Sequence, residues 1–234
     1  MFDYLLGLLK AVSWSGVTSI VFGAAIGAIV SYALQKNSFA EARRQKEKDR
    51  FELRKALGFS LLYKMIQISS ELNNSAVAIS GSIEAGRRAG LVDLYQVVQP
   101  PVPIADKVKF SPEEMALMLS IDSKLFNQIA ALDNLHNSTV SLFEIYLSRR
   151  TAVFERFGAT MVGNIGTTGL TESEKNWLAP RAVELNGIAQ AMFQQATSGA
   201  KLTWAALENL RKMLERDFGL KQRLERDPNV EVMT

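Results

Sequence analysis

The chain of 234 residues contains no cysteine and a single histidine, His136. Without cysteine it can form no disulfide, no thiolate zinc site and no thiol nucleophile. One histidine cannot build a multi-imidazole metal site, and it leaves little scope for a Ser-His-Asp triad. Phosphate-binding loops, nucleophile elbows and kinase motifs are also absent from the sequence. We therefore expect no enzymatic activity, no cofactor, no metal and no small-molecule substrate.

Charge is missing from one long stretch near the N-terminus. Between Lys10 and Lys36 lie 25 residues without a charged side chain, AVSWSGVTSIVFGAAIGAIVSYALQ. As a helix rising about 1.5 Å per residue, this run is long enough to cross a hydrocarbon core of about 30 Å. Trp14 and Tyr32 lie near its ends, where amphipathic rings favour the membrane interface. The run predicts a transmembrane helix over residues 12–35, preceded by an interfacial lead-in over residues 1–11.

Basic residues concentrate directly after this run. Residues 36–64 contain nine basic and four acidic groups, whereas residues 65–234 contain 17 basic and 19 acidic groups. By the positive-inside rule, the N-terminus lies outside and the C-terminal domain lies in the cytoplasm. Residues 36–52 form a predicted juxtamembrane stalk that also attracts anionic lipid. The residues expected to face lipid headgroups are Lys36, Arg43, Arg44, Lys46, Lys48 and Arg50.

The N-terminal region also fits two other interpretations. Ser31-Tyr32-Ala33 fits the small-x-small pattern of a signal-peptide cleavage site, which would make this an exported helical protein. The charge-free run is longer than an ordinary signal sequence, however, and its basic flank lies on the wrong side. The basic block also resembles a nucleic-acid contact, but it adjoins the predicted bilayer and offers only Phe39 and Phe51 for base stacking. We therefore expect no nucleic-acid partner.

Small residues recur every four positions within the predicted span. They are Ser15, Ser19, Gly23, Gly27 and Ser31. Such a stripe lets a second helix backbone approach closely, so it favours a homo-oligomer or pairing with another membrane protein. Three hydroxyls on the same stripe could also line a water path if several copies assemble, although serine can satisfy its own helix backbone.

The rest of the chain has the spacing of long helices, with no repeat and no strand pattern. A capping box at Ser38–Glu41 predicts a new helix start, and the apolar helical spacing from Leu53 to Leu72 predicts a buried face. The proline-rich stretch 99–110 predicts an extended linker. Further predicted elements are a helix start at Ser111, a long helix over 121–157, a glycine-rich loop over 158–170, a capping box at Thr171, a break at 197–199 and a stop at Gly219.

The predicted fold is all-α: one N-terminal transmembrane helix followed by a cytoplasmic antiparallel bundle of three or four long helices. The bundle covers residues 53–219, and a tail covers 220–234. His136 falls on the apolar face of the predicted helix 121–157, as a packed and hydrogen-bonded histidine would. Asp133 lies one turn before it and could pair with it. A Glu-x-x-His motif, which a di-iron bundle requires, is missing.

Two classes of function fit these features. The first is a non-enzymatic scaffold that is anchored in the membrane and self-associates or recruits a partner at the cytoplasmic face. The second is an oligomeric membrane effector that assembles through its small-residue stripe and forms a pore or perturbs the bilayer. The first is favoured, because a Ser/Gly face without charge is weak evidence for a conduit.

Overall fold

The computed structural model describes residues 14–99, 103–157, 160–162, 165–167 and 169–220, and for residues 14–23, 25, 26, 29, 160–162 and 165–167 it describes only the backbone. The chain divides into two compact units, Met1–Arg54 and Lys55–Thr234. The predicted lead-in (1–11), the first two residues of the predicted span and the predicted tail beyond residue 220 lie outside the described residues.

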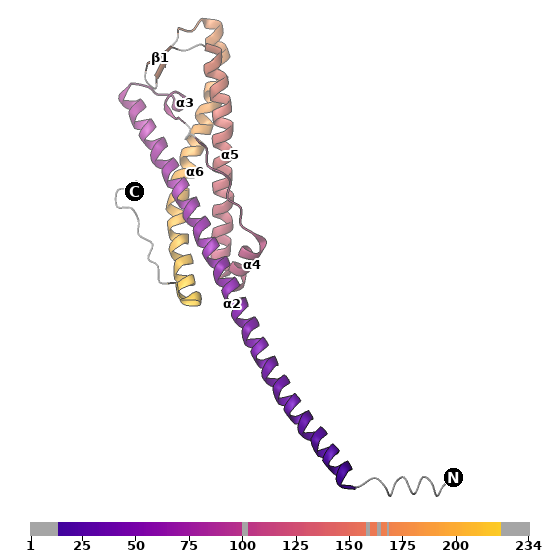
Figure 1. Cartoon of the computed structure of the whole chain (residues 1–234). Coiled ribbons are helices and arrows are strands. Elements are labelled where there is room, and N and C mark those ends of the chain that lie inside the picture. Colours follow the sequence, from indigo (N-terminus) through magenta and orange to yellow (C-terminus); the bar gives the residue numbers. More distant parts are fainter. Residues whose placement is uncertain (1–13, 100–102, 158–159, 163–164, 168, 221–234) are drawn as a thin grey trace, which may run out of the picture. The chain divides into compact units, whose positions relative to one another are not determined.

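Five helices and two short strands make up the described part of the chain (Figure 1). The helices are α2 (Trp14–Arg88), α3 (Leu94–Val97), α4 (Pro112–Ile121), α5 (Ser123–Phe157) and α6 (Glu172–Phe218). The strands β1 (Thr160–Val162) and β2 (Ile165–Thr167) form an antiparallel pair between α5 and α6. The predicted all-helical class is confirmed, but the glycine-rich stretch was wrongly expected to lack strands. Strands of three residues are too short to show an alternating pattern.

Helix α2 is one helix of 75 residues that contributes to both units. The predicted helix start at Ser38 is therefore wrong. No glycine or proline occurs between Gly27 and Gly58, so nothing in the backbone interrupts the helix there. Within the described part of the chain, none of the helices combines the length and the apolarity that crossing a membrane requires.

Several predicted helix ends are confirmed. Ser111 and Thr171 each form a reciprocal capping box, with Glu114 and Glu174 respectively, and so begin α4 and α6. Gly219 ends α6 with a positive φ of 68°, a conformation that glycine adopts without a Cβ clash. The predicted break at 197–199 is wrong, because α6 runs through it.

Packing around Gly199 explains why a glycine occurs inside α6. A Cβ on this residue would lie 2.8 Å from Leu135 Cδ2 and 2.9 Å from Leu72 Cδ1. Glycine inside α6 thus leaves room for side chains of α5 and α2, which approach its backbone closely.

The unit Lys55–Thr234 is a three-helix bundle of the second half of α2, α5 and α6. Gly58 lies against Leu214 while Leu72 lies against Gly199, so α2 and α6 are antiparallel. Residues of α2 and α5 meet in ascending order in the core: Leu61 and Met65 share one cluster with Leu125 and Ile129, and Ile79 shares the next with Phe143 and Tyr146.

Helices α2 and α5 are consequently parallel, and the expected antiparallel arrangement holds only for α6 against the other two. The connection over residues 89–111 is long enough to return the chain to the other end of the bundle before α4 and α5 begin. This return is visible in Figure 1, where the chain leaves the end of α2 near α3 and descends to α4.

Candidate functional site

The predicted helix-packing stripe lies on α2 in the unit Met1–Arg54. For Ser15, Ser19 and Gly23 the structure describes only the backbone, which is helical. Gly27 and Ser31 are described and exposed. A Cβ built on Gly27 meets nothing within 4 Å, so its backbone is open to close approach by another helix.

The predicted lipid-facing residues also lie on α2. Lys36, Arg43, Arg44, Lys46, Lys48 and Arg50 are all exposed. Residues 31–54 are exposed throughout. The helix brings these cations together only through its own periodicity, because a helical turn places residues three and four apart side by side.

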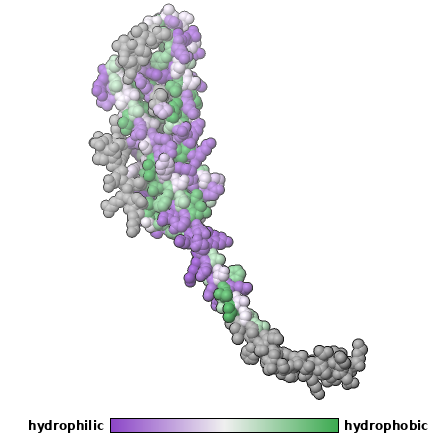
Figure 2. Space-filling model, in the orientation of Figure 1, coloured by the Kyte–Doolittle hydropathy of each residue, from purple (hydrophilic) through white to green (hydrophobic). Residues whose placement is uncertain are grey.

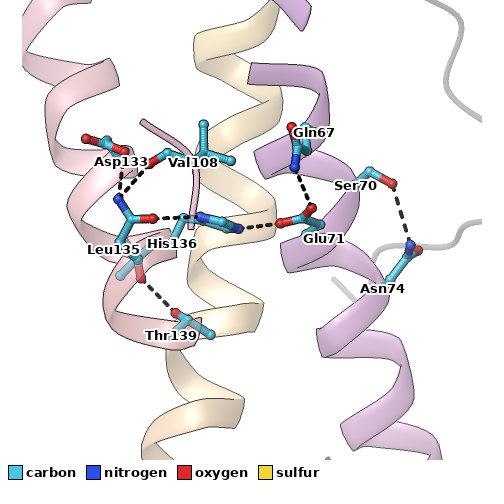
Figure 3. A network of polar contacts seen from close by, with 10 residues as sticks. Gln67, Ser70, Glu71, Asn74, Val108, Asp133, Leu135, His136 and Thr139 are labelled. Atoms are coloured by element: carbon cyan, nitrogen blue, oxygen red, sulfur yellow. Dashed lines mark hydrogen bonds and ion pairs between the residues drawn. The ribbon is translucent and has the colours of Figure 1, made fainter. Parts of the chain in front are cut away.

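A buried polar cluster joins α2 to α5 around His136 (Figure 3). His136 Nε2 lies 2.5 Å from Glu71 Oε2, and the ring N–H donates to this carboxylate. Gln67 Nε2 donates to the second oxygen of Glu71 at 3.0 Å. His136 itself is 1% exposed. The expectation of a packed, hydrogen-bonded histidine is confirmed, but its partners are Glu71 of α2 and the neighbouring Asn137, and not Asp133.

Asp133 takes a separate place in this cluster. Asn137 Nδ2 donates to Asp133 Oδ1 at 2.9 Å and to the carbonyl of Val108 at 3.0 Å, so it ties α5 to the connection before α4. Burial raises the pKa of Asp133, and the hydrogen bond from Asn137 and the proximity of His136 only partly oppose this. The cluster therefore contains one carboxylate that is well paired and one whose charge is disfavoured.

Glu114 is the centre of a second buried cluster, between α2 and α4. Its carboxylate accepts hydrogen bonds from Ser60 Oγ at 2.5 Å, Lys64 Nζ at 2.7 Å and the backbone N–H of Ser111 at 2.6 Å. Burial by itself raises the pKa of Glu114, but these hydrogen bonds outweigh burial and lower it. One residue therefore closes the capping box of α4 and fastens α4 to α2.

A third cluster holds the connection that follows α2. Tyr146 Oη donates to the carbonyl of Val98 at 2.9 Å, and Arg150 Nε donates to the carbonyl of Tyr95 at 3.1 Å. Asn186 of α6 accepts from the backbone N–H of Tyr95 at 3.0 Å. Burial raises the pKa of Tyr146 to about 12, so the phenol stays a hydrogen-bond donor. Side chains of α5 and α6 thus fix α3.

These clusters pair their polar groups with one another inside the bundle. They favour one register between the helices, because a shift would leave buried polar groups without partners, which costs free energy. Among the residues that the structure describes, no three His, Asp or Glu side chains lie close enough to hold a metal ion.

The sequence did not identify Glu71 and Glu114 as members of these clusters. Neither glutamate has a local signal that marks its partner, which lies 65 residues away for Glu71 and 50 residues away for Glu114. The one available signal was the capping-box position of Glu114, which identifies its bond to Ser111 but not the bond to Lys64.

Comparisons with protein-family models, with curated proteins and with solved structures found no match to this chain.

Proposed function

We propose that this protein is a non-enzymatic, membrane-anchored interaction module that presents its helical bundle at the cytoplasmic face of the membrane. It self-associates or recruits a partner there, while residues 12–35 fix it in the bilayer and the basic stalk contacts anionic lipid. The observation that carries the proposal is the charge-free run Ala11–Gln35 followed at once by a strongly basic segment.

The backbone conformation of this run supports the anchor. The described backbone is helical from Trp14 onward, which is the conformation that satisfies every backbone group within a bilayer. The 22 residues from Trp14 to Gln35 would rise about 33 Å as a helix, at about 1.5 Å each, against a hydrocarbon core of about 30 Å.

Three features support an interaction role. The backbone at Gly27 is open on its outer side, as a helix-packing stripe requires. Each of the buried polar clusters is closed within the bundle, so its groups serve helix register. The stalk cations are exposed, which leaves them available to anionic headgroups at about 1 kcal/mol each.

The anchor is tested by fractionating cells that express the full chain with a C-terminal epitope. We expect the protein to stay with membranes after alkaline carbonate extraction and to run at its full mass. Protease added outside intact cells should spare the epitope, and protease added after permeabilisation should remove it. Release by carbonate would contradict the anchor, and a shortened secreted product would establish the exported interpretation.

The small-residue stripe also favours a second candidate, the oligomeric membrane effector. Gly23→Leu with Gly27→Leu separates the two functions, because bulky side chains would prevent close helix approach. Under the effector function, the double variant loses ion flux and toxicity on overexpression together with its oligomers. If oligomers disappear while flux and toxicity stay unchanged, the effector function is excluded.

A further inference from the structure

Between residues 56 and 83, the outer face of α2 carries almost no charge, although Glu84, Arg87 and Arg88 follow at the end of the helix. Only two of the 28 residues from Ala56 to Ile83 are charged, Lys64 and Glu71. Both are used inside the bundle: Lys64 bonds to Glu114 at 2.7 Å and Glu71 bonds to His136 at 2.5 Å. The exposed residues of this stretch, named here the outer α2 face, are Ala56, Phe59, Tyr63, Ile66, Ser70, Asn74, Val77, Ala78 and Gly81.

The outer α2 face also carries large apolar side chains at helical spacing. Phe59, Tyr63 and Ile66 are 37%, 71% and 38% exposed, and their i, i+4, i+7 positions place them in one row. Val77 continues this row three turns later. Other exposed apolar residues of the bundle, such as Ile145 on α5 and Val183 on α6, stand singly, which is ordinary for a protein surface.

In Figure 1, α2 crosses in front of α6, and on this side of the bundle Figure 2 shows green, hydrophobic side chains among purple ones. A helix face that is exposed to water normally carries charged side chains. The cores of protein interfaces, by contrast, are depleted of charge and enriched in aromatic residues. In its lack of charge and in its two aromatic residues, Phe59 and Tyr63, the outer α2 face resembles an interface core.

We infer that the outer α2 face binds the same face of a second copy of this chain, with the two α2 helices parallel. A two-fold interface sets one patch against itself, so any charge in the patch would meet a like charge. An uncharged patch meets this requirement. Small residues at positions 70, 78 and 81 allow the two helices to approach, and a Cβ on Gly81 meets nothing within 4 Å.

The parallel direction rests on the proposed function, since two copies anchored in one membrane have their α2 helices starting from the same side. The predicted packing stripe of residues 15–31 belongs to this same helix α2. Pairing through the outer α2 face would therefore add a second contact along one helix, and the effective concentration set by the first contact would strengthen it.

The absence of cysteine allows a direct test by disulfide crosslinking of the full chain in membranes with copper phenanthroline. We expect Ser70→Cys to give a covalent dimer in at least fivefold higher yield than Ser138→Cys on α5 or Ser198→Cys on α6. These controls are exposed serines on the other two helices. Ala56→Cys should also give a dimer, since parallel helices juxtapose identical residues along their whole length.

A second variant tests the face itself. Ile66→Glu in the Ser70→Cys background should lower the dimer yield at least tenfold, because it sets two carboxylates against each other in an apolar contact. Ile145→Glu is the matched control, because this isoleucine is 43% exposed on α5 and its substitution should leave the yield unchanged. Circular dichroism of both variants should report the same helix content as the parent.

Four results would overturn the inference: equal crosslinking at all three serines, no dimer at Ser70→Cys, no effect of Ile66→Glu, or crosslinking to a different protein. Dimers from Ser70→Cys without any from Ala56→Cys would indicate antiparallel pairing and overturn the parallel arrangement. Failure of the membrane anchor is a separate outcome, because carbonate extraction reports it. Chain recovered in the soluble fraction would be oxidised in the same way.

Discussion

Two consecutive stretches of helix α2 differ sharply although both expose side chains to solvent. Residues 36–55 contain 12 charged residues in 20, whereas residues 56–83 contain two in 28. The first stretch is exposed on all sides up to Arg54 and buries no apolar face. The second buries Leu61, Met65, Ile68, Leu72 and Ile79 on one side and leaves an uncharged row on the other.

The two stretches show two ways in which a helix is stabilised. The charged stretch relies on intrinsic propensity and on pairs at i, i+3 and i, i+4, such as the 2.8 Å hydrogen bond from Gln45 to Asp49. The uncharged stretch relies on burial, which contributes far more free energy per residue. A stretch whose inner face already anchors it has no need of surface ion pairs, and its outer face is free to serve a partner.

The largest difference between the two stretches is expected when one leucine in each is replaced by alanine. Leu72 is 1% exposed and packs against the α6 backbone at Gly199, so Leu72→Ala should lower the free energy of unfolding by about 3 to 4 kcal/mol through lost burial and a cavity. Leu53 is 62% exposed, so Leu53→Ala should change it by less than about 0.5 kcal/mol. Denaturant unfolding measures both, and equal effects would show that the two stretches do not differ in this way.

Neutralising the stalk should affect lipid binding and leave folding unchanged. Lys46→Gln, Lys48→Gln and Arg50→Gln together should weaken binding to vesicles containing phosphatidylserine by about 3 kcal/mol, at about 1 kcal/mol per residue near the surface. The effect should shrink as salt is raised. Lys109→Gln, Lys201→Gln and Lys212→Gln in the bundle form the matched control, and an equal loss from them would contradict a specific role for the stalk.

Removing a charge should destabilise the fold where Lys64, on the inner side of the uncharged stretch, bonds to Glu114. Removing a charge from the stalk should have little effect on stability. Glu114→Gln keeps an acceptor for Ser111 but removes the ionic bond to Lys64, so it should lower the free energy of unfolding by about 2 kcal/mol at neutral pH. Glu47→Gln in the stalk should cost less than about 0.5 kcal/mol.

The pH dependence of this prediction has a definite sign. The folded protein holds the pKa of Glu114 below its ordinary value of 4.5. The stabilisation by its carboxylate is therefore complete above 4.5 and is lost as pH falls through the lower, folded-state pKa. The difference between the parent protein and Glu114→Gln should vanish over that acidic interval, and a difference that grew there would contradict the assignment.

The smallest effect is expected at Asp133, with the opposite sign. Because burial raises its pKa in the folded protein, ionised Asp133 destabilises the fold at neutral pH, and this cost disappears as pH falls through the raised pKa. Asp133→Asn keeps an acceptor for Asn137 and should stabilise the protein by less than about 1 kcal/mol at pH 7. Unfolding curves at pH 7 and pH 4 would show the gain only at the higher pH.

Signals carried by neighbouring residues made the helix ends predictable. Ser111 and Thr171 with their glutamates three residues later, and Gly219 after an apolar helical run, each mark a boundary by local hydrogen bonding or by a positive φ. The same kind of signal was misleading at Ser38, because residues of capping-box type also occur inside a helix that no glycine or proline interrupts.

Features that depend on distant residues were not predictable. Gly199 resembles a helix break in sequence and is a packing site in the fold, because Leu72 and Leu135 come from helices remote in the chain. The pairing of Glu71 with His136, and the parallel direction of α2 and α5, likewise depend on where the long connection takes the chain. Periodicity identifies which face of a helix is buried but not which helix buries it.

The parallel placement of α2 and α5 determines the order in which the bundle can assemble during translation. Helix α2 is complete at Arg88, yet α6, which packs along it, ends only at Phe218. At roughly 5–20 residues per second, about 7 to 26 s pass before that helix has been synthesised. Until then, the side of α2 that packs against α6 and the outer α2 face are both apolar surface without a partner. The nascent protein therefore has a period of vulnerability to aggregation, and a chaperone that holds emerging apolar helices would protect it.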